Sequence, residues 1–70
     1  MAQISLDNSH TYLDASDAAP IIDSMHLWDT VWEMMDDDLR EKVHAEHAPC
    51  TNEEFLTAYL AESEENLIIG

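Results

Sequence analysis

The chain has 70 residues, of which 16 are Asp or Glu and 2 are Lys or Arg, so its formal net charge is −14 at pH 7. An apolar content of 46% is typical of a folded protein rather than of a disordered acidic tail. This charge excludes direct binding to nucleic acid, because phosphates must be met by basic residues and the sequence offers only Arg40 and Lys42. We expect a single acidic domain over residues 1–70.

The sequence also indicates the cellular compartment in which the protein is expected. Its one cysteine, Cys50, cannot form an internal disulfide, which suits a reducing cytoplasm. The first ten residues carry neither the basic region nor the apolar run of a signal peptide, and no stretch approaches the ~20 apolar residues of a membrane span. We therefore expect a cytoplasmic protein without membrane association.

The first predicted element is a β-hairpin. Residues 4–6 and 11–13 alternate in character, and Asp7-Asn8-Ser9 between them has the composition of a turn. The hairpin would supply two antiparallel strands.

A short helix over residues 17–23 is predicted next. Ser16 can act as its N-cap, which would place Pro20 in the first turn, where the missing N–H is harmless. This placement predicts that Ile21 and Ile22 turn inward.

A longer helix is then predicted from Ser24, its N-cap, to the residues before Pro49, where the chain must leave the helical conformation. Apolar residues recur along it at helical spacing, which predicts a buried stripe that contains both tryptophans. Aspartate favours caps over helix interiors, so a break is expected near residues 36–38, with Asp38 well placed to restart the helix. The stripe consists of Trp28, Trp32, Met35, Leu39 and Val43, widened by Leu27, Val31 and Met34.

The last helix is predicted over residues 52–62, because Thr51 and Glu54 form a capping box. Its apolar face contains Phe55, Leu56, Tyr59 and Leu60. The apolar run at 67–69 predicts a strand beside the N-terminal hairpin. The expected fold class is therefore α+β, with a small antiparallel β-sheet, formed by the N-terminal hairpin plus the C-terminal strand, packed against two to four α-helices.

One cluster resembles a metal site. Glu41, His44 and His47 share a helix face, and Cys50 follows closely. A small metal-binding domain is one alternative, but the spacing matches no standard zinc motif, and histidines at a helix C-terminus also suit the helix dipole. We expect no metal and no cofactor. We also expect no enzyme, because so short a chain offers little concave pocket even if Cys50 were a nucleophile.

The carboxylates are the strongest functional signal. Solvated helices usually pair Glu with Lys four residues on, and this sequence forgoes such pairs nearly everywhere. Solubility alone is one explanation. The other is mimicry of duplex DNA, which carries one negative charge per ~1.7 Å of axis, so that the chain would bind a basic nucleic-acid-binding protein. The candidate partner-binding residues are Asp29, Glu33, Asp36, Asp37, Asp38, Glu53, Glu54, Glu62, Glu64 and Glu65.

Residues 35–44, 48–56 and 59–60 resemble small proteins of phages and bacterial mobile elements, in particular short acidic anti-CRISPR proteins that act on type I effectors. The resemblance covers residues 28–69. It implies a non-enzymatic inhibitor in the bacterial host cytoplasm, a monomer or weak dimer, that occupies the DNA-binding groove of a Cascade complex, with type I-C as the narrower expectation. An antitoxin or interaction module that neutralises another basic protein remains the alternative.

Overall fold

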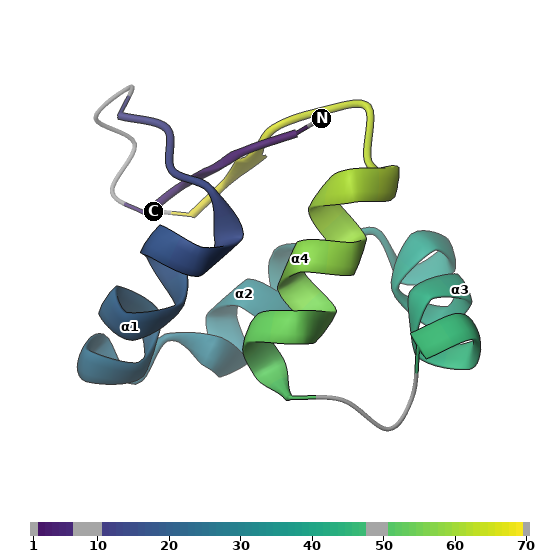
Figure 1. The fold of residues 1–70 in the computed structure, drawn as a ribbon, viewed down its shortest axis with the longest axis horizontal. Helices are drawn as coiled ribbons and strands as arrows, with labels where there is room; N and C mark the ends of the chain where they lie inside the picture. Colours follow the sequence, from purple (N-terminus) through teal and green to yellow (C-terminus); the bar gives the residue numbers. More distant parts are fainter. Residues whose placement is uncertain (1, 7–10, 48–50, 70) are drawn as a thin grey trace.

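The computed structural model describes residues 2–6, 11–47 and 51–69, and its regular elements are mostly helical (Figure 1). In chain order they are β1 (Ile4–Ser5), α1 (Ala15–Met25), α2 (Trp28–Met34), α3 (Asp37–His47), α4 (Asn52–Glu62) and β2 (Leu67–Ile68). Helix α4 packs against both α1 and α3 and lies between them in Figure 1. Within the described ranges, no helix is long and apolar enough to cross a membrane.

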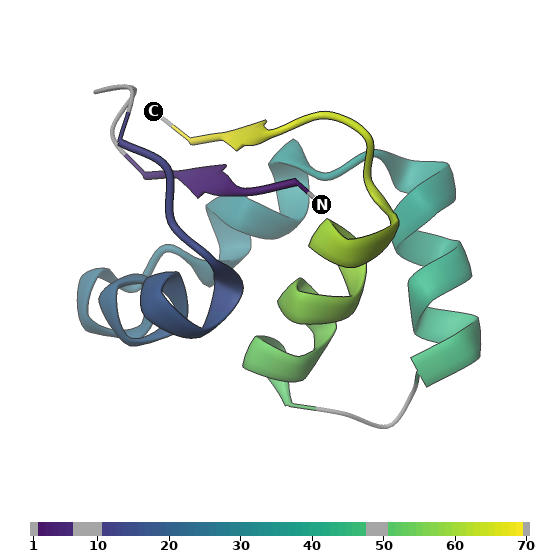
Figure 2. The same ribbon diagram turned by 45° about the horizontal axis from the view of Figure 1, so that its top comes forward.

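The two strands pair in parallel, so the prediction of an antiparallel sheet is wrong. Ile4 lies opposite Leu67 and Ser5 opposite Ile68, and Figure 2 shows both arrows pointing the same way. The predicted hairpin is reduced to an isolated antiparallel bridge, in which Ile4 and Leu13 exchange N–H···O bonds of 2.9 and 2.8 Å. Its predicted turn lies outside the described residues.

The start of each strand explains the parallel pairing. The Ala2 N–H donates to the Leu60 carbonyl at 3.0 Å, so the segment leading into β1 passes the last turn of α4. The segment leading into β2 leaves α4 at that same end, and both strands therefore run away from it in one direction (Figure 2). Parallel strands need a long crossover connection, which the four intervening helices provide.

Helix α1 is longer than the predicted 17–23, because its N-cap is Asp14 rather than Ser16. Pro20 consequently lies beyond the first turn, on the exposed side of the helix. The helix continues through Ser24, which therefore does not cap the next element. It ends at His26, which adopts a left-handed conformation with φ of 55°.

The face of α1 that packs against the core determines which isoleucine is buried. The buried positions follow the i, i+3, i+4, i+7 pattern of one helix face: Ala15, Ala18, Ala19 and Ile22. Ile22 is fully buried, as predicted, whereas Ile21 is 41% exposed, so its predicted inward position is wrong.

The expected break in the long helix is confirmed, although the restart lies earlier than predicted. Met35 is extended, with φ of −71° and ψ of 147°. The Asp36 carboxylate then accepts a hydrogen bond from the Leu39 N–H at 3.0 Å, so Asp36 and not Asp38 caps α3. Helix α3 ends at His47, within the predicted limit before Pro49.

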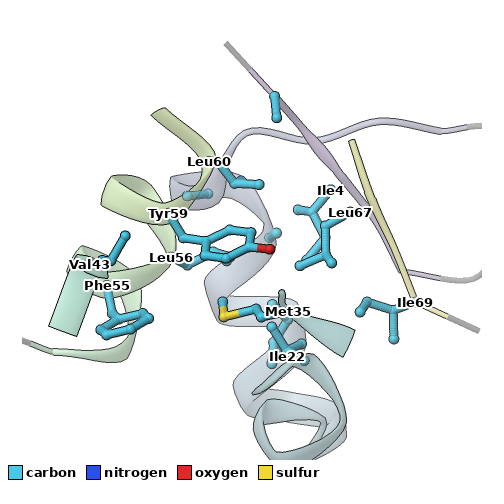
Figure 3. Close-up of a cluster of buried hydrophobic side chains, with 14 residues drawn as sticks. Ile4, Ile22, Met35, Val43, Phe55, Leu56, Tyr59, Leu60, Leu67 and Ile69 are labelled. Carbon is cyan, nitrogen blue, oxygen red and sulfur yellow. The ribbon is translucent and has the colours of Figure 1, made fainter. Parts of the chain in front are cut away.

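Helix α4 has the predicted bounds and the predicted capping box, with the Glu54 N–H donating to the Thr51 hydroxyl at 3.2 Å. Its buried side chains converge with those of the strands, α1 and Met35 on a common interior (Figure 3). The two tryptophans are partly buried against this core and stack on each other with ring centroids 5.3 Å apart. Met34 departs from the predicted stripe, since it is 52% exposed.

Candidate partner-binding surface

The candidate carboxylates lie on the surface of the protein. Nine of the ten are exposed, and Glu62 is partly buried. They fall into three groups: Asp29, Glu33, Asp36, Asp37 and Asp38 on α2 and at the start of α3; Glu53 and Glu54 in the first turn of α4; and Glu62, Glu64 and Glu65 at its other end. The acidic residues therefore surround α2, α3 and α4 rather than forming one continuous row.

Both cationic side chains are engaged in contacts within the protein. Arg40 donates to the Trp32 carbonyl at 2.7 Å and pairs with Asp37 at 3.0 Å, which joins the end of α2 to the start of α3. Lys42 lies 3.4 Å from Glu62 and 4.0 Å from Glu46, which joins α3 to α4. The two cations therefore brace the helices, and most of the exposed carboxylates keep an uncompensated charge.

The structure brings Asp36 of the first acidic group and the whole third group together around one open hollow of about 580 Å³, which we call the acidic depression. Asp36 reaches it from the α2–α3 corner, and Glu62, Glu64 and Glu65 reach it from the end of α4 and the following loop. Its other lining residues are Met34, Met35, Leu39, Tyr59, Ser63, Asn66 and Leu67. Carboxylates thus border a hollow that is partly apolar.

Polar contacts hold the walls of the acidic depression in place. The Asp36 N–H donates to the Tyr59 hydroxyl at 2.8 Å, which ties the α2–α3 corner to α4. On the opposite wall the Ser63 hydroxyl donates to the Glu65 carbonyl at 2.8 Å. The carboxylates are therefore presented by segments whose backbone is fixed.

Glu62 is the least exposed of the candidate carboxylates. Its Oε1 atom faces Lys42, while its Oε2 atom is buried and has no hydrogen-bond partner among the described residues. A buried acceptor without a partner is unfavourable for the folded protein, and this oxygen is closed to a donor from outside.

The remaining candidates do not line the acidic depression. Glu53 and Glu54 lie at the other end of α4, about 12–14 Å from Glu62 along a helix that rises ~1.5 Å per residue. Glu54 is also committed to the capping box. Asp29 and Glu33 on α2, and Asp37 and Asp38 at the start of α3, also lie outside the lining.

Sequence reasoning missed the apolar part of this surface. The stripe predicted from the sequence includes Met34, and the sequence predicts Tyr59 only as part of the apolar face of α4. The predicted helix break is the signal that could have indicated the exposure of Met34. Met34 is the last residue of α2, so no following helical turn holds its side chain against the core. Nothing in the sequence indicates that the hydroxyl of Tyr59 meets the α2–α3 corner.

The metal-site alternative is tested only in part. Within residues 2–6, 11–47 and 51–69, no group of three or more His, Cys, Asp or Glu side chains could hold a metal ion. Cys50 lies outside the described residues, and the side chain of His47 is not described. His44 is exposed and lies near Phe55, with ring centroids 6.4 Å apart, as part of the α3–α4 contact.

The site therefore defines a small, mostly helical protein with an exposed acidic surface and both of its Lys and Arg side chains engaged internally. Comparison with protein families is more specific, because the family model described as "Anti-CRISPR protein AcrIC5" matches residues 22–66. The chain belongs to this AcrIC5 family of type I-C anti-CRISPR proteins. No curated protein and no solved structure matches the chain. The matched segment contains all ten candidate carboxylates and ends before β2.

Proposed function

We propose that this protein is a non-enzymatic inhibitor that binds the DNA-binding groove of a type I-C effector complex, Cascade, in the cytoplasm of the bacterial host. Its carboxylates would take the place of DNA phosphates and so prevent target DNA from binding. Family membership supports CRISPR machinery as the target rather than the toxin considered as an alternative.

The observation that supports the proposal is the excess of exposed carboxylates that have no cationic partner among the described residues. The formal net charge is −14, and the two cations are used between helices α2, α3 and α4. Because exposed, uncompensated carboxylates repel one another, this arrangement costs stability, and a basic partner would relieve the repulsion. A groove lined with Arg and Lys offers this relief and would bind the protein at the expense of DNA.

Competition on the purified effector complex tests the proposal directly. Labelled target DNA is bound first, and the unlabelled protein is then added at increasing concentration. The proposal predicts full displacement of DNA, with a midpoint that rises steeply with ionic strength because many exposed charges contribute. If protein and DNA bind the complex together, with no loss of DNA affinity, the mimicry mechanism is wrong.

Charge reversals test which face is used. Each exposed ion pair contributes only ~0–1 kcal/mol, so Glu33→Lys alone should weaken binding modestly. Combining it with Asp29→Lys and Asp38→Lys should weaken binding strongly, mainly by slowing association, while the fold survives, because all three side chains are exposed. Asp36 is left unchanged because its carboxylate caps α3, and Asp37 because it pairs with Arg40.

A further inference from the structure

We propose that the acidic depression is the docking centre of the inhibitor and that it receives an arginine side chain of the effector. This inference rests on the proposed function and adds the position of the contact and the chemistry of the group that fills it. The other carboxylates then steer the encounter, while the acidic depression determines how long the complex lasts.

The lining of the acidic depression matches the two parts of an arginine side chain. Met34 is 52% exposed and Leu39 is partly exposed, so the methylene stem of an arginine would meet the apolar surface of these two side chains. Met35 and Leu67 are buried beneath them. Asp36, Glu62, Glu64 and Glu65 surround this surface with carboxylates, which suit the guanidinium group. Neither a purely charged nor a purely apolar occupant would use both features.

Glu62 contributes a partly buried carboxylate at the edge of the acidic depression. Its Oε1 atom is turned toward Lys42 at 3.4 Å, and its Oε2 atom is buried, so the accessible acceptors are mainly the exposed carboxylates of Asp36, Glu64 and Glu65. A guanidinium carries five N–H donors in a planar fork, so one arginine can pair with two neighbouring rim carboxylates together. A lysine ammonium is more strongly hydrated and loses more on entering a partly apolar hollow.

The walls are set before the partner arrives. The hydrogen bond from the Asp36 N–H to the Tyr59 hydroxyl holds one wall, and the contact of Arg40 with the Trp32 carbonyl holds the corner behind it. Preformed surfaces spend less ordering entropy on binding, and residues at the centre of such hollows account for most of the affinity of an interface.

Charge decides between the classes of occupant. A second copy of the chain also carries a formal charge of −14 and would be repelled from an acidic rim. Nucleic acid is excluded on the same ground. A basic protein is the occupant whose charge complements this surface.

Two matched pairs of variants test the proposal on the purified type I-C effector complex, with association and dissociation followed separately. The first pair compares exposed methionines: Met34→Ser alters the acidic depression, and Met25→Ser alters α1, where Met25 is 55% exposed. We expect Met34→Ser to speed dissociation about tenfold, as hot-spot truncation does, and Met25→Ser to leave both rates unchanged.

The second pair compares equal changes of charge. Glu64→Gln with Glu65→Gln neutralises two rim carboxylates, whereas Asp17→Asn with Glu41→Gln neutralises two exposed carboxylates outside the candidate set. We expect dissociation about tenfold faster for the rim pair, and a change of less than roughly threefold, confined to association, for the control pair.

The outcomes separate this inference from the proposed function. If the wild-type protein binds and displaces DNA but the members of each matched pair behave alike, the docking centre is wrong and general charge steering suffices. If the wild-type protein does not bind the effector at all, the proposed function fails and the inference fails with it. Circular dichroism of every variant, compared with wild type, excludes misfolding as the cause.

Discussion

Helices α1 and α3 each have 11 residues and both pack against α4, yet they are held there by different forces. Helix α1 buries a face of three alanines and Ile22. In α3 the buried apolar side chain is Val43, with Leu39 partly covered. Helix α1 is therefore attached to α4 by hydrophobic burial along its length. Helix α3 buries fewer apolar side chains against α4.

Polar contacts make up the difference for α3. The hydroxyl of Tyr59 receives the Asp36 N–H, Arg40 reaches back to the Trp32 carbonyl, and Lys42 meets Glu62. A helix fixed at a few polar points can leave its outer side to carboxylates.

The largest expected effect is on the attachment of α1. Ile22→Ala should lower the free energy of unfolding by about 2–5 kcal/mol, since it removes a fully buried side chain and leaves a cavity. The control is Ile21→Ala, one residue away and 41% exposed, which should change stability by less than about 0.5 kcal/mol. Urea unfolding measures both. Equal losses would show that α1 is not held by the face described here.

A smaller effect is expected on the attachment of α3. Arg40→Gln should lower the free energy of unfolding by about 1–2 kcal/mol, because it removes a charged hydrogen bond to the Trp32 carbonyl as well as the ion pair with Asp37. Lys42→Gln makes the same change of charge but loses only ion pairs, so it should cost about 0–1 kcal/mol. An effect of Lys42→Gln as large as that of Arg40→Gln would mean that charge, not the backbone contact, matters.

The sequence was most informative where local chemistry decides the structure. The capping box at Thr51 and Glu54 gave α4 its bounds, and the aspartates at 36–38 indicated the break between α2 and α3. For α1 the sequence favours Ser16 as the N-cap, whereas the cap position is Asp14. Ile21 is wrongly predicted for another reason: the face that packs is set by Ala15, Ala18 and Ala19 together with Ile22, and Ile21 lies about 100° from Ile22 around the helix.

The sheet and the acidic depression depend on contacts distant in sequence. Alternation in the N-terminal segment predicts strands but not their partners, and the partner of β1 comes from the other end of the chain. Likewise, the carboxylates at 36 and at 62–65 were each identified, but only the packing of α4 against the α2–α3 corner brings them around one hollow. Composition predicts an acidic surface and cannot predict its shape.

The smallest expected effect is that of salt, and it should separate the two helices again. Raising NaCl from about 10 mM to about 150 mM shortens the Debye length from ~30 Å to ~8 Å, which screens repulsion among exposed carboxylates. Stability should rise by less than about 1 kcal/mol, because the added screening acts on exposed charges. The start of α3 carries the exposed Asp36, Asp37, Asp38 and Glu41, whose repulsion salt screens, and the attachment of α3 includes ion pairs of Arg40 and Lys42, which the same salt weakens. Helix α1 is held by apolar contacts that salt at this level hardly changes. Amide hydrogen exchange should therefore change more with salt in α3 than in α1. A melting temperature that falls over this range would contradict the self-repulsion on which the proposed function depends.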